Sequence, residues 1–250
     1  MNYFYRTELV MNTEQERIVK TVLAFTEMNF QDPNLANKFK PPLILHGPWG
    51  TGKTETIVQT ISFLLKKKIE VQQLAQQYNV RLDTLPPQRI LLSTLTNSAA
   101  DLCIQKMFDK VVMEHPSINM LRIVAPYRYL NNMDARILKY CKLNERRDAP
   151  RLPTIPEILA ANLVIVTDNC AISALLRSME LYGKFTHIFL DEAAQAFEPS
   201  ALGPLVLADP KTVVLLAGYR TPLLRIFYNN KYHSQLRTSS KCGLSSTEVR

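Results

Sequence analysis

The fold of this 250-residue chain is decided by the stretch Gly47-Pro48-Trp49-Gly50-Thr51-Gly52-Lys53-Thr54, which has the pattern G-x-x-x-x-G-K-T of a phosphate-binding loop. A triphosphate must be surrounded at close range by backbone N–H groups, and glycine permits both that approach and the necessary dihedral angles. We expect the Lys53 ammonium to contact the β- and γ-phosphates and the Thr54 hydroxyl to bind Mg²⁺. All eight residues are therefore candidates for binding a nucleoside triphosphate.

The sequence on either side of the loop supports this interpretation. Leu43-Ile44-Leu45 is a short apolar run typical of a buried strand, and it lies just before the loop. After the loop, Ile57, Ile61 and Leu64 recur at helical spacing. The order strand, loop, helix is the one that a phosphate loop requires, so a chance match in a turn explains the residues less well.

Apolar runs alternate with helical patterns along the rest of the chain. Further runs occupy residues 90–92, 121–124, 163–166, 188–190 and 213–216. Alternation of strand and helix predicts an α/β fold, with a parallel sheet and helices on both faces. Ligands of such sheets bind at the carboxyl ends of the strands, where the phosphate loop is expected to lie.

The composition is that of an ordinary globular protein. With 46% hydrophobic and 21% charged residues, 250 residues suffice for one large domain but not for a second of equal size. Because no apolar run approaches the length of a membrane span and the first residues lack the apolar core of a signal peptide, we expect no membrane partner and a cytoplasmic or nuclear location. The four cysteines form no C-x-x-C pair, so we expect reduced thiols and no zinc site.

The net charge of +8 is concentrated near one end of the chain. Residues 219–250 hold six basic residues and one acidic residue, which leaves only +3 for residues 1–218. A mixed, solvated surface therefore explains the main body better than a basic face for nucleic acid does. We expect residues 219–250, which contain serines and lack periodicity, to form a divergent, poorly ordered tail.

Residues 1–218 are expected to form the domain, with two polar excursions from its core. Residues 66–88 begin with three consecutive lysines and continue through several glutamines to a pair of prolines. Residues 126–157 are rich in Arg, Asn and Pro. Neither segment has the composition of a buried strand.

Two acidic residues follow the apolar run 188–190, in the segment Asp191-Glu192-Ala193-Ala194-Gln195. In phosphoryl transfer to water, one carboxylate holds the Mg²⁺ that bridges the phosphates, and a neighbouring base orients the attacking water. Asp191 suits the first role and Glu192 the second. Acids at a strand end can also be solvated turn residues, but the phosphate loop earlier in the chain favours the catalytic interpretation.

Three segments together resemble a known family. Residues 47–54, 97–101 and 191–195, in that order, look like motifs I, Ia and II of the superfamily 1 helicases. The branch that they resemble is that of the RNA helicases of nonsense-mediated decay, with the greatest likeness to helicases with zinc finger domains. The likeness covers roughly residues 8–218. It implies a P-loop NTPase fold with a RecA-like sheet, and the cofactors ATP and Mg²⁺.

The same resemblance implies an activity and partners. A member of this family hydrolyses ATP and couples the hydrolysis to movement along a single strand of RNA, DNA being the alternative. Ribonucleoprotein or mRNA-decay partners would be expected. The implied catalytic residues are Lys53, Asp191, Glu192 and Gln195, with Thr54 and Asp191 as metal ligands.

Two further groups of residues acquire roles from the resemblance. Gln15, in Asn12-Thr13-Glu14-Gln15, resembles the Q motif and would hydrogen-bond the adenine edge. A motif Ia loop that contacts the nucleic-acid backbone is implied for Thr94, Thr96, Asn97 and Ser98. Both also have a purely structural interpretation, because Gln15 stands at a helix start and residues 96–98 can cap a helix.

The likeness weakens after the sixth apolar run. Motif III in this branch reads Gly-Asp-x-x-Gln-Leu, and Gly218-Tyr219-Arg220-Thr221-Pro222-Leu223 keeps only its ends. A phenol cannot hold the γ-phosphate as a carboxylate does, and proline has neither a side-chain amide nor a backbone donor. The resemblance also implies a second RecA-like domain that carries the arginine finger, and we expect these 250 residues not to include it. We therefore expect the chain alone to bind Mg-ATP weakly, hydrolyse it very slowly and unwind nothing.

Two other interpretations stay open. A non-catalytic short form could act as an RNA- or protein-binding module through residues 66–157 and the basic tail. An oligomeric ring ATPase is less favoured, because Gln195 and the segment 97–98 would have no role in it.

Overall fold

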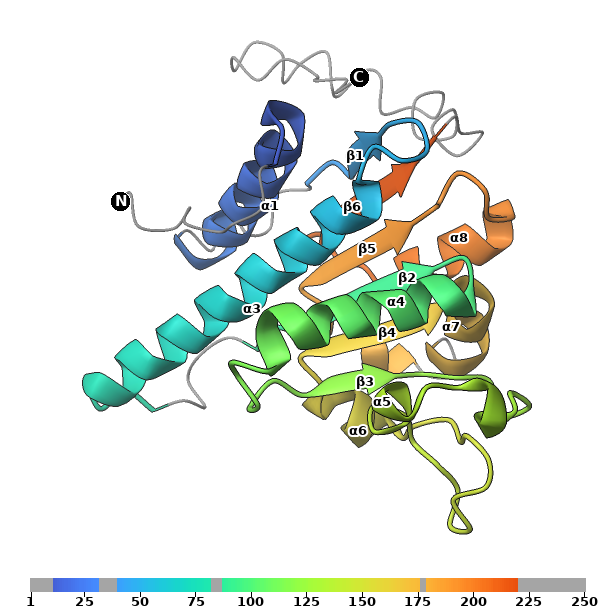
Figure 1. Cartoon of the computed structure of the whole chain (residues 1–250). Helices are drawn as coiled ribbons and strands as arrows, with labels where there is room; N and C mark the ends of the chain where they lie inside the picture. Colours follow the sequence, from blue (N-terminus) through green and yellow to red (C-terminus); the bar gives the residue numbers. More distant parts are fainter. Residues whose placement is uncertain (1–10, 32–39, 82–86, 176–178, 220–250) are drawn as a thin grey trace.

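The centre of the molecule is a six-stranded parallel sheet with the strand order β1-β6-β5-β2-β4-β3 (Figure 1). The computed structural model describes residues 11–31, 40–81, 87–175 and 179–219. The strands are β1 (Leu43–His46), β2 (Ile90–Thr94), β3 (Met120–Arg122), β4 (Leu163–Thr167), β5 (His187–Asp191) and β6 (Val213–Gly218). Every residue of β2, β3, β5 and β6 is buried, which explains why these strands are continuous apolar runs in the sequence.

Helices cover both faces of the sheet (Figure 1). One layer contains α1 (Thr13–Gln31), α3 (Lys53–Gln77), α4 (Asn97–Met107) with its π-helical continuation η2 (Phe108–Val112), and the short α5 (Ala135–Leu138). The other layer contains α6 (Ile155–Ala160), α7 (Asp168–Leu175) and α8 (Glu198–Leu205). Two 3-10 turns, η3 (Leu130–Asn132) and η4 (Met179–Leu181), complete the described elements.

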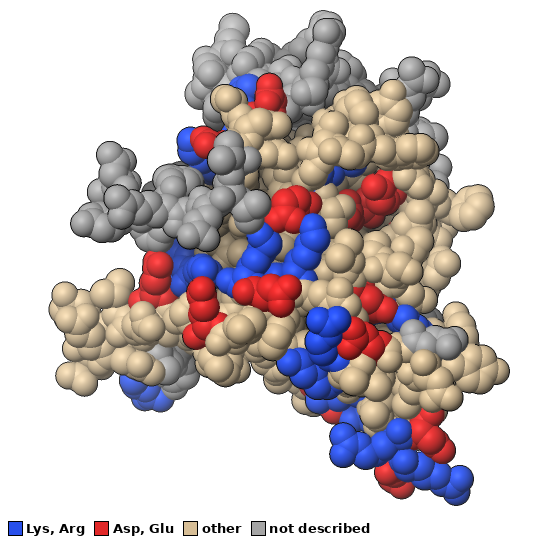
Figure 2. Space-filling model, in the orientation of Figure 1, with Lys and Arg blue, Asp and Glu red and all other residues tan. Residues whose placement is uncertain are grey.

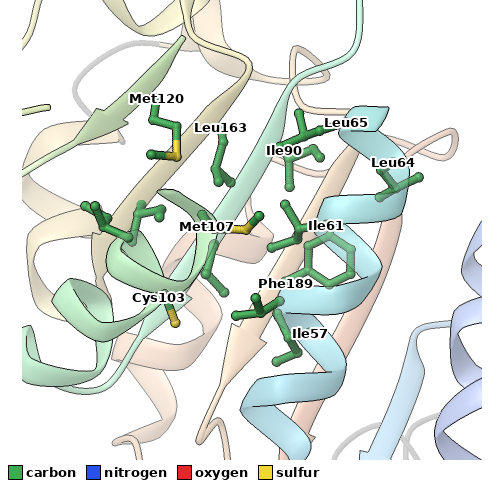
Figure 3. Packing of buried hydrophobic residues seen from close by; sticks show 14 of the residues in the cluster. Ile57, Ile61, Leu64, Leu65, Ile90, Cys103, Met107, Met120, Leu163 and Phe189 are labelled. Atoms are coloured by element: carbon green, nitrogen blue, oxygen red, sulfur yellow. The ribbon is translucent and has the colours of Figure 1, made fainter. Parts of the chain in front are cut away.

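Each helical layer has its own hydrophobic cluster. Neighbouring residues of a strand point to opposite faces, so Ile90 and Leu92 belong to the cluster under α3 and α4, whereas Leu91 belongs to the cluster on the other side. Figure 3 shows the first cluster at close range, with helix side chains packed over strand side chains. The helix side chains are Ile57, Ile61, Leu64 and Leu65 of α3 and Met107 of α4, and the strand side chains are Ile90, Leu163 and Phe189. Each such buried side chain contributes roughly 1.5–3 kcal/mol. The helix after the phosphate loop is therefore held firmly on the sheet.

The predicted α/β fold with a parallel sheet is confirmed. All six apolar runs of the sequence coincide with strands, although the third begins and ends earlier than residues 121–124. Among the described strands this edge strand pairs with β4, over Met120–Arg122, and Arg122 also forms an isolated parallel bridge with Cys141. Ile123 and Val124 nevertheless stay buried as the chain leaves the sheet.

The two predicted polar excursions have different structures. Residues 66–77 continue α3, whose far end projects beyond the sheet with Leu74 and Tyr78 exposed (Figure 1). In the segment 126–157, by contrast, Met133 and Ile137 are buried in the cluster under α3 and α4. The division into a domain and a tail stays a prediction, because residues 220–250 lie outside the described part of the chain.

Charged side chains of both signs are intermixed on the face shown in Figure 2. On α3, for example, Glu55 accepts a hydrogen bond from Lys106 at 2.5 Å and forms an ion pair with Lys110 at 2.9 Å. Lys66 in turn pairs with Glu114 at 3.0 Å. Such pairs neutralise much of the basic charge locally.

The structure also bears on the cysteines and on membrane insertion. Cys103, Cys141 and Cys170 are buried and take part in no disulfide among the described residues, and Cys242 lies outside those residues. Among the described helices, none is both long enough and apolar enough to cross a bilayer.

Candidate functional site

The phosphate loop connects the end of β1 to the first turn of α3 at the carboxyl edge of the sheet. Gly50 and Gly52 have φ angles of 78° and 82°, a left-handed conformation that strains any other residue. A Cβ on Gly52 would also lie 2.9 Å from the side-chain nitrogen of Gln15, and one on Gly47 would lie 2.7 Å from the Thr51 hydroxyl. The glycines are therefore required by the backbone path of the loop itself.

Lys53 points back across this loop from the start of α3. Its ammonium donates to the carbonyl oxygens of Gly47 at 2.9 Å and Pro48 at 3.0 Å, and the residue is only 6% exposed. A positive charge thus lies inside the ring of backbone that the glycines shape. Phosphate oxygens are stronger acceptors than these carbonyls, so the same ammonium can exchange its partners for a bound anion.

Thr54 links the loop to the end of β5. Its hydroxyl donates to the Asp191 carboxylate at 2.6 Å, and Asp191 is 1% exposed. Burial raises the pKa of the Asp191 carboxyl above its ordinary value, whereas the hydrogen bond from Thr54 opposes that rise. A hydroxyl and a carboxylate oxygen on the loop side of the sheet are the hard ligands that Mg²⁺ takes, so these residues fit that ion.

Glu192 occupies an unusual backbone conformation directly after β5. Its φ angle is 57°, a left-handed value that is strained for a residue with a side chain, and its N–H donates to the Asp191 carboxylate at 3.0 Å. The Gln195 side-chain amide donates to the Glu192 carboxylate at 2.6 Å. The turn therefore directs Glu192 and Gln195 together at the same edge that carries Lys53 and Thr54.

The end of β6 supports this turn from the side. The N–H of Ala193 donates to the carbonyl of Ala217 at 2.9 Å. A Cβ on Gly218 would lie 2.7 Å from the Cβ of Ala194, so the two segments touch without room for a side chain. Tyr219, the residue at which the sequence departs from motif III, stacks on His46 just before the loop, with ring centroids 5.7 Å apart. Pro222 lies outside the described residues.

Gln15 binds both the start of α1 and the phosphate loop. Its N–H donates to the Asn12 side chain at 2.8 Å, and its own side-chain oxygen accepts from the Asn12 N–H at 3.0 Å, a reciprocal cap. The side-chain nitrogen donates to the Thr51 carbonyl at 3.1 Å. Trp49, at the outer turn of the loop, is 74% exposed.

The candidate nucleic-acid residues lie at the start of α4, at the same edge of the sheet. Thr96 caps the helix by accepting from the Ala99 N–H at 3.2 Å, and Thr96, Asn97 and Ser98 are exposed. Thr94 is fully buried and donates to the Thr96 carbonyl at 3.0 Å. The structure thus brings three of the four residues to the surface and places Thr94 beneath them.

Sequence reasoning missed an ionic cluster that holds this helix start. Arg122, 1% exposed at the end of β3, donates to Asp101 at 3.1 Å and to the Asn97 side-chain oxygen at 2.8 Å. Arg128 donates to the same carboxylate at 2.7 Å and to the same amide oxygen at 3.2 Å. A lone arginine inside the apolar run of β3 was the available signal, because a fully buried guanidinium requires a partner.

A buried carboxyl lies between the two parts of the site. Asp168, 2% exposed at the start of α7, accepts from the Ser93 hydroxyl at 2.5 Å through one oxygen. Its other oxygen has no hydrogen-bond partner in the part of the chain that the structure describes. Burial raises the pKa of the Asp168 carboxyl to about 6, the negative charge of Asp191 adds to the rise, and the bond from Ser93 opposes it.

Comparison with known proteins supports the arrangement. The AAA_11 family model, described as an AAA domain, matches residues 11–152 and 154–218. The mouse (Mus musculus) protein named 3'-5' exoribonuclease HELZ2 is 39% identical over 183 residues, which are 72% of this chain and 5% of that protein. The human (Homo sapiens) protein named probable helicase with zinc finger domain is 33% identical over 191 residues, 76% of this chain and 9% of the relative.

A third relative belongs to the RNA helicases by name. Human (Homo sapiens) RNA helicase Mov10l1 is 30% identical over 212 residues, 84% of this chain and 14% of that protein. The chain therefore spans between 5% and 14% of the length of these three relatives. This chain belongs to the AAA_11 family and to the branch of superfamily 1 RNA helicases that resembles the helicases of nonsense-mediated decay, and it forms their helicase-like ATP-binding domain.

Proposed function

We propose that this domain binds ATP with Mg²⁺ and hydrolyses it, and that the whole polypeptide couples the hydrolysis to movement along single-stranded RNA. The observation that carries the proposal is the hydrogen bond from Thr54 to Asp191 at 2.6 Å, because it joins the phosphate loop to the acidic pair at the end of β5. Two halves of a phosphoryl-transfer site, 137 positions apart in the chain, thereby face one another.

Each residue then has a defined task. Lys53 exchanges the carbonyls of Gly47 and Pro48 for phosphate oxygens, and Thr54 and Asp191 hold the ion that supplies charge neutralisation at the phosphates. Glu192, which directly follows Asp191 at the end of β5, accepts a proton from the attacking water. Gln195 positions that carboxylate through their 2.6 Å hydrogen bond.

The exposed start of α4 supplies a place for the nucleic-acid backbone. Thr96, Asn97 and Ser98 present hydroxyl and amide groups beside the N-terminal N–H groups of the helix, where a phosphate is stabilised. Two of the relatives are RNA helicases or probable helicases by name, and this favours RNA over DNA as the strand bound.

A non-catalytic RNA- or protein-binding module is the second candidate. It is favoured by one observation, namely that Tyr219 stands where motif III has a carboxylate and is stacked on His46. A phenol in that position does not replace a carboxylate as an acceptor near the γ-phosphate.

Nucleotide binding and turnover of the purified chain separate these candidates. Trp49 is the single tryptophan of the chain, so energy transfer from it to a methylanthraniloyl-labelled ATP reports occupancy of the loop. We expect Lys53→Ala to weaken binding by about 10- to 100-fold, as the loss of a charged hydrogen bond does. Lys184→Ala, which removes an exposed lysine elsewhere, serves as the matched control.

Steady-state ATP turnover with and without single-stranded RNA completes the test. Slow turnover that Lys53→Ala abolishes supports the proposed ATPase. RNA binding that is indifferent to Lys53→Ala and Glu192→Gln, together with no measurable affinity for ATP, would establish the second candidate instead.

A further inference from the structure

A pocket opens at the carboxyl edge of the sheet beside the start of α4. Its volume is about 430 Å³, and it is lined by residues 95–97, 125, 127–129, 167, 169 and 170. These lie at or just after the carboxyl ends of β2, β3 and β4, including the first residues of α4 and α7, so the pocket belongs to the edge where ligands of parallel sheets bind. Its size falls within the range of roughly 300–1,000 Å³ that is typical of small-ligand pockets.

Two tyrosines line this pocket and are nevertheless almost fully accessible. Tyr127 is 85% exposed and Tyr129 is 78% exposed. Single exposed apolar residues are common on protein surfaces, but two aromatic rings lining one pocket are an unusual concentration. Their rings therefore offer large flat surfaces to a ligand.

The turn that carries the tyrosines is rigidly built. The Arg128 N–H donates to the Ala125 carbonyl at 3.0 Å, which closes a β-turn with Pro126 at its second position. The Arg128 side chain ties this turn to α4 through Asp101 at 2.7 Å and Asn97 at 3.2 Å. Tyr127 and Tyr129 therefore stand on either side of a residue that is fixed to the helix.

The charge of this region suits an anionic ligand. Arg122 and Arg128 share the single carboxylate of Asp101, which leaves one positive charge in the cluster. The N-terminal N–H groups of α4 add the positive end of a helix dipole beside the same pocket. Thr96, Asn97 and Asn169 supply hydroxyl and amide groups along its wall.

We infer that Tyr127 and Tyr129 form a stacking platform for the bases of a single-stranded nucleic acid whose phosphates lie against the start of α4. Aromatic faces beside a positively charged surface are the combination that binds single strands, because every base has a face that can stack. The inference rests on the proposed function, because it assumes the bound single strand and adds the contacts to its bases. It also specifies weak dependence on base sequence, since stacking is tolerant of base identity.

Fluorescence anisotropy of a labelled oligouridine of about 12 nucleotides tests the platform with the full 250-residue chain. We expect Tyr127→Ala and Tyr129→Ala each to weaken binding by about 5- to 100-fold, the effect of losing one stacked base. Tyr127→Phe and Tyr129→Phe retain a ring and should bind within about twofold of the parent chain. Tyr78→Ala, just past the far end of α3, removes another largely exposed tyrosine and should change nothing.

Two further measurements separate stacking from charge. A strand of the same length with abasic sugars keeps every phosphate, so the alanine variants should bind it as the parent chain does. The slope of log affinity against log salt concentration should also stay unchanged in those variants, because they remove no charge.

The outcomes distinguish this inference from the function on which it rests. Unchanged oligouridine binding by the double variant Tyr127→Ala/Tyr129→Ala overturns the platform alone. Labelled ATP is titrated into the same samples, so a chain that binds ATP but no RNA overturns the platform together with the proposed nucleic-acid site. A chain that binds neither ligand overturns the proposed function as a whole.

Discussion

The Thr54 hydroxyl donates a hydrogen bond of 2.6 Å to the Asp191 carboxylate, across the gap between the first turn of α3 and the end of β5. Thr54 belongs to the first turn of α3, and Asp191 ends a strand in the middle of the sheet. Their contact therefore shows that the fold places the start of α3 directly beside the acidic turn.

This contact leads to a prediction for Thr54→Val. The substitution keeps the shape of the side chain and removes its oxygen, so the domain should stay folded and lose one ligand for Mg²⁺. We expect the Mg²⁺-dependent part of ATP affinity to fall by about 10-fold, as for the loss of a hydrogen bond to a charged group. Titration of labelled ATP with Mg²⁺ and with a chelator measures that part directly.

Thr60→Val provides the control for this prediction. Thr60 lies on the same helix, is fully buried and donates to the Thr56 carbonyl at 2.7 Å, away from the loop. The Thr60→Val substitution should therefore leave the Mg²⁺ dependence of ATP affinity unchanged. Equal Mg²⁺ dependence in the Thr54 and Thr60 variants would remove Thr54 from the metal site.

Glu192→Gln should separate binding from hydrolysis. The amide keeps the size of the side chain and can still meet Gln195, but it cannot accept a proton from water at neutral pH. ATP affinity should stay within about twofold of the parent chain, while turnover falls by about 100-fold or more, within the range of general-base catalysis. Glu145→Gln, an exposed site in the segment 126–157, should have no effect on either quantity. Equal turnover in the Glu192 variant would rule out the assigned role.

Much of the fold could be predicted from the sequence because the determining signals are local. The phosphate loop has fixed spacing, and strands that are buried on both faces, such as Leu163–Thr167, stand out as short apolar runs. Gly50 and Gly52 mark a backbone path that other residues cannot follow. Such signals need no knowledge of tertiary contacts.

The remainder depends on contacts between distant segments. Lys66 opens the stretch that the sequence marks as a polar excursion from the core, and residues 66–77 of it are helical because α3 continues past the sheet. Asp101 pairs with residues 21 and 27 positions away, and no spacing rule indicates such pairs. The pocket beside Tyr127 cannot be predicted from the sequence either, since three separate segments, which follow β2, β3 and β4, make its walls.

The buried ionic cluster gives a prediction about stability. Arg122→Ala would leave Asp101 facing Arg128 alone and would open a cavity at the end of β3. Breaking a buried pair by removing one partner costs about 3–5 kcal/mol, so urea denaturation followed by circular dichroism should show a loss of that size. Arg136→Ala, which breaks an exposed pair with Asp134, should leave the stability nearly unchanged, because solvent screens such a pair. Similar losses in both variants would contradict the importance of burial here.

Asp168 gives a prediction about pH. Its pKa is about 6 in the folded chain, above the ordinary 3.8, so between these values the folded state binds more protons than the unfolded state. Stability is then lost as the pH rises through this window, and the ionised carboxyl costs up to about 3 kcal/mol at pH 8. Asp168→Asn removes this cost, and its amide oxygen can still accept from Ser93.

The stability of Asp168→Asn relative to the parent chain should therefore increase by about 1 kcal/mol between pH 5 and pH 8. Urea denaturation at the two pH values measures this difference. Asp109→Asn changes an exposed aspartate and should show no such dependence. A constant difference at both pH values for Asp168→Asn would mean that its carboxyl titrates normally.

Gln15 gives a prediction about nucleotide choice. Its side chain lies against the loop through the 3.1 Å bond to the Thr51 carbonyl, and its reciprocal bonds with Asn12 fix it at the start of α1. If that amide also reads the adenine edge, Gln15→Ala should lower ATP affinity by about 10-fold and GTP affinity much less. The ratio of the two affinities, measured by competition against labelled ATP, is the decisive quantity, because damage to the loop alone would weaken both nucleotides equally. Gln73→Ala, an exposed glutamine on α3, should leave the ratio unchanged.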